Sequence, residues 1–189
     1  MKLFYFVGWL IVRMFAKMFY RLKVIGIENF PEGKILLAPN HISLADPPVL
    51  GSAVDRELSY MAKKELFENK LMNFILRKVN VFPVSRESID PSAIKNAVRI
   101  LKNNKPLVIF PQGTRNKDFS EERIKLGFIK IAKIAKSDIL PVAIINTDKM
   151  MSFKQIKIIF SKPIPISLPE ENILQIYVKS MKTMLNKYS

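Results

Sequence analysis

After residue 23, short apolar runs alternate with segments whose apolar residues recur at helical spacing. Turn residues such as Pro31-Glu32-Gly33 separate them. Because this alternation joins parallel strands through right-handed crossovers, it predicts an α/β fold with a mostly parallel central sheet flanked by helices. Strands are expected at 34–39, 58–62, 79–84, 106–110, 139–145 and 153–160. Helices are expected to begin at Asp46 and to cover 64–77, 92–103, 121–136 and 169–187.

Three of these elements carry specific expectations. Asp46 is expected to be the N-cap of its helix, with Pro47 at the first helical position. Pro83 has no backbone N–H, so its strand either ends there or lies at a sheet edge. The helix at 64–77 is expected to be amphipathic, with its apolar side chains at Phe67, Leu71, Phe74 and Ile75.

Length and composition limit the class of protein. A chain of 189 residues forms one domain with a substantial core. The 25% of charged residues exclude a polytopic membrane protein. The chain has no cysteine and one histidine, so neither a disulfide framework nor a zinc site is expected, and no metal ligand is assigned.

The net charge of +15, from 31 basic and 16 acidic residues, calls for an anionic partner. Nucleic acid and anionic lipid are the two candidates. The basic residues are spread along the chain, and no helix-turn-helix, RNA-recognition or zinc-finger motif is present. A non-enzymatic nucleic-acid-binding protein is therefore a remote alternative, and we expect no nucleic acid as partner.

The first 23 residues form a basic and aromatic segment without acidic residues. Drawn as a helix, it places its cations in an arc of about 100°, with rings and aliphatic side chains over most of the remainder. This predicts a helix in the membrane interface, ahead of a catalytic domain at 24–189. The residues expected in contact with the membrane are Phe6, Trp9, Arg13, Phe15 and Lys17.

The uncharged stretch 3–12 is about half as long as a bilayer crossing needs. Arg13 and Lys17 interrupt it, and no small-residue cleavage site follows, which argues against a signal peptide. We therefore expect peripheral or monotopic attachment to the cytoplasmic face of the cell membrane. The alternative is an N-terminal helix that packs on its own domain.

Chemically reactive residues follow three of the predicted strands. Histidine exchanges a proton near pH 7, and His41 has Asp46 five residues further on to hold one tautomer. Arg86 follows the strand that ends near Val84. The third strand end, residues 110–116, combines Gly113, Thr114 and Arg115, which are suited to binding a phosphate. Since ligands bind at the carboxyl ends of parallel strands, we expect these groups to meet.

Four motifs in order resemble those of the glycerophospholipid acyltransferase superfamily. Asn40-His41-x-Ser43-x-x-Asp46 is similar to its first block, the HX4D motif of His, four residues and Asp. The second, third and fourth blocks resemble Phe82-Pro83-Val84-Ser85-Arg86, Phe110-Pro111-Gln112-Gly113-Thr114-Arg115 and Ile139-Leu140-Pro141-Val142-Ala143-Ile144. The resemblance covers about residues 20–165, and in layout it is nearest to the bacterial 1-acyl-sn-glycerol-3-phosphate acyltransferases.

The resemblance implies an enzyme that makes phosphatidic acid from lysophosphatidic acid and an acyl-ACP or acyl-CoA thioester, without a further cofactor. His41 is then the general base and Asp46 its orienting carboxylate. Arg86, Gly113, Thr114 and Arg115 hold the acceptor phosphate and so place its free hydroxyl at His41. The resemblance also implies that the protein acts at the membrane, in phospholipid biosynthesis.

One residue departs from the family pattern. Gln112 stands where the third block usually has Glu, which keeps the size and loses the charge. An acyltransferase of the same superfamily that acts on another lysolipid is therefore the alternative function, although both arginines favour a phosphate-bearing acceptor.

Overall fold

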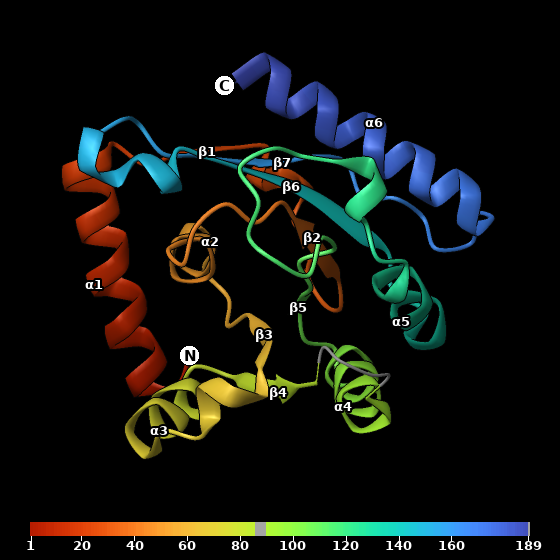
Figure 1. The fold of residues 1–189 in the computed structure, drawn as a ribbon, viewed down its shortest axis with the longest axis horizontal. Helices are drawn as coiled ribbons and strands as arrows, with labels where there is room; N and C mark the ends of the chain where they lie inside the picture. Colours follow the sequence, from red (N-terminus) through yellow and green to blue (C-terminus); the bar gives the residue numbers. More distant parts are fainter. Residues whose placement is uncertain (86–89, 189) are drawn as a thin grey trace.

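A seven-stranded, mostly parallel sheet forms the centre of the molecule, in the order β1-β7-β6-β2-β5-β3-β4 (Figure 1). The structure is a computed structural model and describes residues 1–85 and 90–188. Neighbouring strands are parallel except β6 and β7, which run antiparallel. The strands are β1 Lys23–Ile25, β2 Leu36–Pro39, β3 Ser59–Lys63, β4 Val81–Val84, β5 Leu107–Val108, β6 Ile139–Ile145 and β7 Lys157–Phe160.

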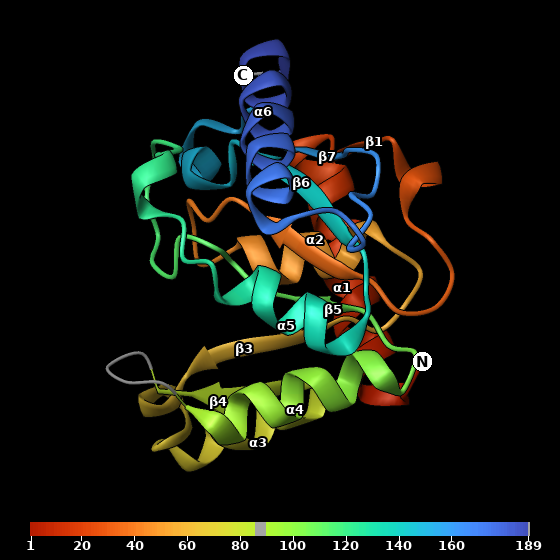
Figure 2. The same cartoon turned by 90° about the vertical axis from the view of Figure 1, so that its right-hand side faces the viewer.

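Helices cover both faces of this sheet (Figures 1 and 2). α1 (Leu3–Tyr20) and α2 (Asp46–Ala53) lie on one face. α4 (Pro91–Lys102), α5 (Gly127–Ala135) and α6 (Glu170–Tyr188) lie on the other. Successive side chains of a strand point to opposite faces, so Leu36 packs with α5 and Leu37 with α2. The predicted α/β class is confirmed.

Of the two alternatives predicted for the proline-containing strand, the structure shows the position at the sheet edge. β4 is the last strand of the sheet, and Pro83 pairs in register with Ala62 of β3. Because β4 has a hydrogen-bonded neighbour on one side, the missing N–H of Pro83 is tolerated there.

Two predicted helices are wrong in extent. The segment expected as one helix at 64–77 is a 3₁₀ turn, η2 (Lys64–Phe67), followed by α3 (Lys70–Lys78). The Asn69 side chain accepts a hydrogen bond from Met72 N (3.0 Å), and this cap starts a new helix. The segment expected at 121–136 is likewise a 3₁₀ turn, η3 (Glu121–Arg123), followed by α5, because Lys125 N bonds to Pro111 O (2.9 Å) instead of continuing a helix.

The remaining differences concern short elements. β1 was not predicted, since three residues give no periodic signal, and β7 is shorter than the run 153–160 that indicated it. Two further 3₁₀ turns, η1 (Ile27–Asn29) and η4 (Thr147–Ser152), follow β1 and β6. η4 matters for function because it begins where β6 ends, beside the carboxyl end of β2.

Candidate active site

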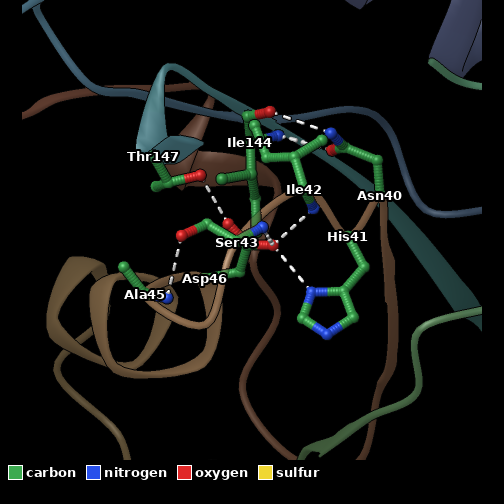
Figure 3. A network of polar contacts seen from close by, with 8 residues as sticks. All are labelled: Asn40, His41, Ile42, Ser43, Ala45, Asp46, Ile144 and Thr147. Carbon is green, nitrogen blue, oxygen red and sulfur yellow. Dashed lines mark hydrogen bonds and ion pairs between the residues drawn. The ribbon is translucent and has the colours of Figure 1, made fainter. Parts of the chain in front are cut away.

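The loop from Asn40 to Ala45 joins β2 to α2 and carries the predicted base (Figure 3). The buried Asn40 side chain fixes this loop to the neighbouring strand β6. Its Nδ2 donates to the Ile144 carbonyl (2.9 Å), and its Oδ1 accepts from Ile144 N (2.7 Å). This two-way bond replaces sheet pairing where β2 ends, so the backbone before His41 has one defined path.

His41 and Asp46 are in direct contact, as the spacing predicted. His41 Nδ1 lies 2.7 Å from Asp46 Oδ2, and the imidazole stacks on Phe110 with ring centroids 4.1 Å apart. Because an ionised carboxylate accepts, this bond assigns the proton to Nδ1 and leaves Nε2 as the acceptor of the ring. The side chain of His41 is 12% exposed, so its ring is accessible from one side.

The expectation that Asp46 caps α2 is wrong. Ala45 occupies the N-cap position, and Asp46 is the first helical residue. Its carboxylate turns back toward the preceding loop, where Oδ2 accepts from Ile42 N (2.7 Å) and Ser43 N (2.8 Å). The turn of the loop thus wraps its own N–H groups around the carboxylate. Asp46 therefore organises the loop of His41 and does not cap the helix.

A hydrogen bond from Tyr60 anchors the beginning of α2. Tyr60 donates its hydroxyl to the Pro47 carbonyl (2.8 Å). Burial raises the pKa of Tyr60 well above its usual value, with the neighbouring Tyr5 adding to the effect. The hydroxyl therefore stays protonated and remains a donor, which anchors α2 directly after Asp46.

The turn after β5 comes to the same place as His41. Asn116 N donates to the His41 carbonyl (2.7 Å), and Gly113 N donates to the Phe110 carbonyl (3.0 Å). Gly113 has φ +69°, a conformation that favours glycine. A Cβ there would also lie 3.3–3.4 Å from the side chain of Lys125. The structure thus brings the third predicted motif beside the first.

The predicted phosphate-binding residues are placed as follows. Thr114 and Arg115 are exposed on this turn, so they face solvent beside the His41 loop. Arg86 lies outside the described residues. Lys125 is a further cation next to Gly113. The sequence did not indicate it as a site residue, because Lys125 lies within the helix that was predicted at 121–136.

Gln112 is buried, with 4% of its surface exposed. Its Nε2 donates weakly to the Asp118 carbonyl (3.4 Å), which ties the two ends of the exposed turn together. Its Oε1 has no hydrogen-bond partner among the described residues. The family's glutamate, if ionised, offers no donor to this carbonyl, so the neutral amide fits the observed contact.

A cavity of about 550 Å³ opens next to Phe110, the residue that stacks on His41. Apolar side chains form most of its wall, and Ser85, Asp90 and Lys125 stand among them. The apolar lining residues include Met61, Val84, Ile94, Ile109, Phe128 and Ile131. This space suits an apolar chain whose reactive end lies near the imidazole. Within residues 1–85 and 90–188, no group of three or more His, Asp or Glu side chains is arranged to hold a metal ion.

α1 packs one side on the domain and exposes the other. Tyr5, Ala16 and Tyr20 are buried. Trp9 donates its indole N–H to the Val54 carbonyl (2.8 Å), and Arg13 pairs with Asp55. These two side chains face the domain, contrary to the expectation that they point toward lipid, because Val54 and Asp55, which follow α2, supply partners for their polar groups.

The exposed side of α1 is strongly apolar. It includes two of the predicted membrane residues, Phe6 and Phe15, and Lys17 is exposed as well. At its N-terminal end, Phe4 meets Phe74 of α3 (ring centroids 6.2 Å apart), which is itself exposed. We call this surface the α1 apolar face; it consists of Leu3, Phe4, Phe6, Val7, Leu10, Ile11, Met14, Phe15, Met18 and Phe19. By the length and composition of the whole helix alone, α1 meets the requirement for crossing a membrane, although the uncharged stretch 3–12 within it does not.

Comparison with known proteins agrees with the motifs. The family model described as Acyltransferase matches residues 21–145. The chain belongs to this acyltransferase family. The match includes His41, Asp46 and the turn at 110–116.

Two curated relatives are both named 1-acyl-sn-glycerol-3-phosphate acyltransferase. The chain is 37% identical over 123 residues to the 1-acyl-sn-glycerol-3-phosphate acyltransferase of Bacillus subtilis (strain 168), an alignment covering 64% of this chain and 61% of that protein. It is 35% identical over 146 residues to that of Streptococcus pneumoniae, covering 75% of this chain and 53% of that protein. The chain thus spans between half and two thirds of the length of these relatives.

The fold is similar to that of a solved acyltransferase. The crystal structure of the 1-acyl-sn-glycerophosphate (LPA) acyltransferase PlsC from Thermotoga maritima matches with a TM-score of 0.77 and 23% identity, covering 95% of this chain and 78% of that chain. At this identity the match establishes the shared architecture of the sheet and its flanking helices.

Proposed function

We propose that this chain is an acyltransferase that transfers a fatty acyl group from an acyl-ACP or acyl-CoA thioester to the free hydroxyl of 1-acyl-sn-glycerol-3-phosphate, giving phosphatidic acid. The observation that carries the proposal is the hydrogen bond between His41 Nδ1 and a buried, multiply bonded Asp46, which leaves Nε2 as a proton acceptor. The names of two relatives at 37% and 35% identity supply the acceptor.

In this mechanism His41 Nε2 removes the proton from the acceptor hydroxyl as the oxygen attacks the thioester carbonyl. Asp46 stabilises the imidazolium that forms. When the tetrahedral intermediate collapses, the C–S bond breaks and the imidazolium returns the proton to the leaving thiolate. The products are a free thiol and a new ester, and no covalent enzyme intermediate is needed.

The acceptor is held through its phosphate. Arg115 supplies a planar pair of donors, and the exposed turn supplies the Thr114 hydroxyl and backbone N–H groups beside Gly113. This turn is hydrogen-bonded to the His41 backbone through Asn116, so a phosphate held there is fixed relative to the base. Arg86 is proposed as a second phosphate ligand on sequence grounds.

The membrane is the proposed location of the acceptor. We propose that the α1 apolar face lies in the interface of an anionic leaflet on the cytoplasmic side, as a peripheral or monotopic anchor. An exposed apolar helix face on a chain of net charge +15 supports this, since apolar burial and attraction to anionic lipid act together.

The test is an acyl-transfer assay with lysophosphatidic acid as acceptor and matched acyl-ACP and acyl-CoA donors. Formation of phosphatidic acid with one or both donors is the expected result, and the ratio assigns the carrier. Lysophosphatidylcholine and a lyso-amino lipid serve as alternative acceptors. Preference for either of these over lysophosphatidic acid would replace the proposed acceptor while keeping the reaction.

A further inference from the structure

Thr147 stands next to the His41–Asp46 pair, although it lies 101 residues from Asp46 in the chain. It is the first residue of η4, separated from the end of β6 by Asn146, and 1% of its surface is exposed. Its hydroxyl donates a short hydrogen bond to Asp46 Oδ1 (Figure 3). Thr147 therefore touches the orienting carboxylate without touching the imidazole.

This hydroxyl completes the coordination of a buried anion. The Asp46 side chain is fully buried, and its Oδ2 is occupied by Ile42 N, Ser43 N and His41. Among the described residues, Thr147 is the donor that reaches Oδ1. A carboxylate has about four acceptor sites, and a buried one left without a donor is strongly disfavoured. The hydroxyl thus fixes the rotation of the carboxyl group.

Hydrogen bonds of two neighbouring residues, Asn146 and Ile144, fix the position of Thr147. Asn146 adopts a left-handed conformation (φ +67°) and donates its Nδ2 to the Gln155 carbonyl (2.9 Å). Ile144, three residues before Thr147, is the residue bonded both ways by Asn40. The Thr147 hydroxyl and the His41 loop are therefore fixed to the same end of β6.

We propose that Thr147 is a positioning residue for the proton transfer: by holding Asp46 Oδ1 it directs Oδ2 at His41 Nδ1 and so keeps Nε2 available as the base. This inference rests on the proposed function for its kinetic consequence. Its structural part, control of the His41 tautomer, is measurable without substrate.

Three variants and one control test the proposal. Thr147→Val removes the hydroxyl at nearly constant size, Thr147→Ala removes it and leaves space, and Thr147→Ser keeps it. Ser52→Ala is the matched control, because Ser52 is also buried and donates its hydroxyl to the Val49 carbonyl within α2 (2.8 Å). Steady-state kinetics with lysophosphatidic acid are measured for each, together with the nitrogen and proton NMR signals of the imidazole. His41 is the chain's one histidine, so these signals need no assignment.

In Thr147→Val and Thr147→Ala we expect kcat to fall about 10- to 100-fold, since the base is misplaced, while KM for the acceptor changes less than about twofold. The signals of His41 should shift from the Nδ1-protonated form toward a mixture of tautomers. Thr147→Ser should restore both kcat and the wild-type spectrum. Ser52→Ala should lose thermal stability yet keep kcat and the spectrum.

Two results would overturn the inference: a wild-type imidazole spectrum and kcat in a folded Thr147→Val or Thr147→Ala, or equal effects of these variants and Ser52→Ala. If Thr147→Val does not fold, Thr147→Ala decides. Absence of acyl transfer in the wild type would instead contradict the proposed function, and the tautomer measurement would still decide the role of Thr147.

Discussion

At the scale of single residues, the Asp46 carboxylate connects the His41 loop to the end of strand β6. Three donors meet its Oδ2, and a fourth from another strand end meets its Oδ1. The spacing between His41 and Asp46 predicted their contact, because five residues are enough to fold back. It did not predict the wrapped loop or Thr147, which depend on where β6 ends. Thr147 is the second residue after the strand predicted at 139–145, so the rule that found the other strand ends would have found it as well.

Gln112 offers a prediction about the departure from the family pattern. Its buried Nε2 donates to the Asp118 carbonyl, a role that an ionised carboxylate cannot take. Gln112→Glu should therefore lower the free energy of unfolding by about 1–3 kcal/mol at pH 8. The loss should be smaller at pH 5, because burial favours the neutral acid, which can donate, and stability falls as pH rises through its titration.

The measurement is thermal unfolding of Gln112→Glu at both pH values. Gln155→Glu is the control, since Gln155 also donates to a carbonyl, that of Arg21, from an exposed position. Equal stability of Gln112→Glu and the wild type at pH 8 would mean that the amide bond to Asp118 is unimportant.

Arg115 tests the phosphate site. It is exposed on the turn that Asn116 ties to His41, so a bound phosphate should depend on its guanidinium. Arg115→Ala should raise KM for lysophosphatidic acid about 10-fold or more and lower kcat, since the acceptor hydroxyl is no longer held at the base. The control is Arg123→Ala on η3, another exposed arginine. Wild-type kinetics in Arg115→Ala would contradict the assignment of this residue.

At the scale of elements, α1 packs on its own domain, which is one of the two alternatives that the sequence left open, and it leaves an apolar side exposed. Periodicity located the helix but could not say which of its aromatic residues α2 would cover. Trp9 and Arg13 meet partners at Val54 and Asp55, and neither partner lies near them in the sequence.

Vesicle binding should depend on the α1 apolar face. Changing Ile11, Met14 and Met18 together to Ser should weaken binding to anionic vesicles at least about tenfold, because each exposed side chain loses a favourable transfer into the interface. Most of this loss should persist at high salt, which screens charges and leaves apolar burial intact. The measurement is co-sedimentation with vesicles at low and high salt. Ile134→Ser on α5, exposed on the opposite side of the sheet, is the control. Unchanged binding of the triple variant would place membrane contact elsewhere.

The start of α4 provides a pH-dependent prediction. Asp90 is its N-cap and accepts from the Ser92 hydroxyl, Ser85 N and Ala93 N, and these bonds lower the pKa of Asp90 to about 2. Since this folded value is below the unfolded one, the bonds stabilise the fold above about pH 4 and are lost as pH falls toward 2.

Asp90→Asn isolates the charge, because asparagine is also a good N-cap. Its melting temperature should be below that of the wild type at pH 6, and the two should converge as the pH approaches 2. Differential scanning calorimetry across this range is the measurement. A gap that does not change with pH would show that the carboxylate charge is irrelevant to the cap.

The helices and strands also show which features of the fold the sequence could predict and which it could not. α4 and β6 were predicted well. The buried residues of α4 recur at helical spacing, and β6 is a continuous apolar run that is buried throughout. The breaks at Asn69 and Lys125 were missed, because each depends on a single hydrogen bond, one local and one to Pro111. A single bond of this kind leaves no period in the sequence.

At the scale of the whole molecule, the parallel sheet gathers motifs that are far apart in the chain. β2, β5 and β6 are neighbours, so the residues that follow them meet at one edge of the sheet. The motifs that follow β2 and β5 predicted that these two strand ends meet. They did not predict the 550 Å³ cavity beside Phe110, which arises from side chains of four separate elements and the turns between them.

The central claim is that His41 acts as the general base of acyl transfer to lysophosphatidic acid. The most direct measurement is the rate of phosphatidic acid formation by the wild type and by His41→Ala, with folding checked by circular dichroism. The wild type should form phosphatidic acid, and His41→Ala should be slower by about 10²- to 10⁴-fold or more, because the chain's one imidazole is lost. Wild-type turnover in a folded His41→Ala would contradict the account.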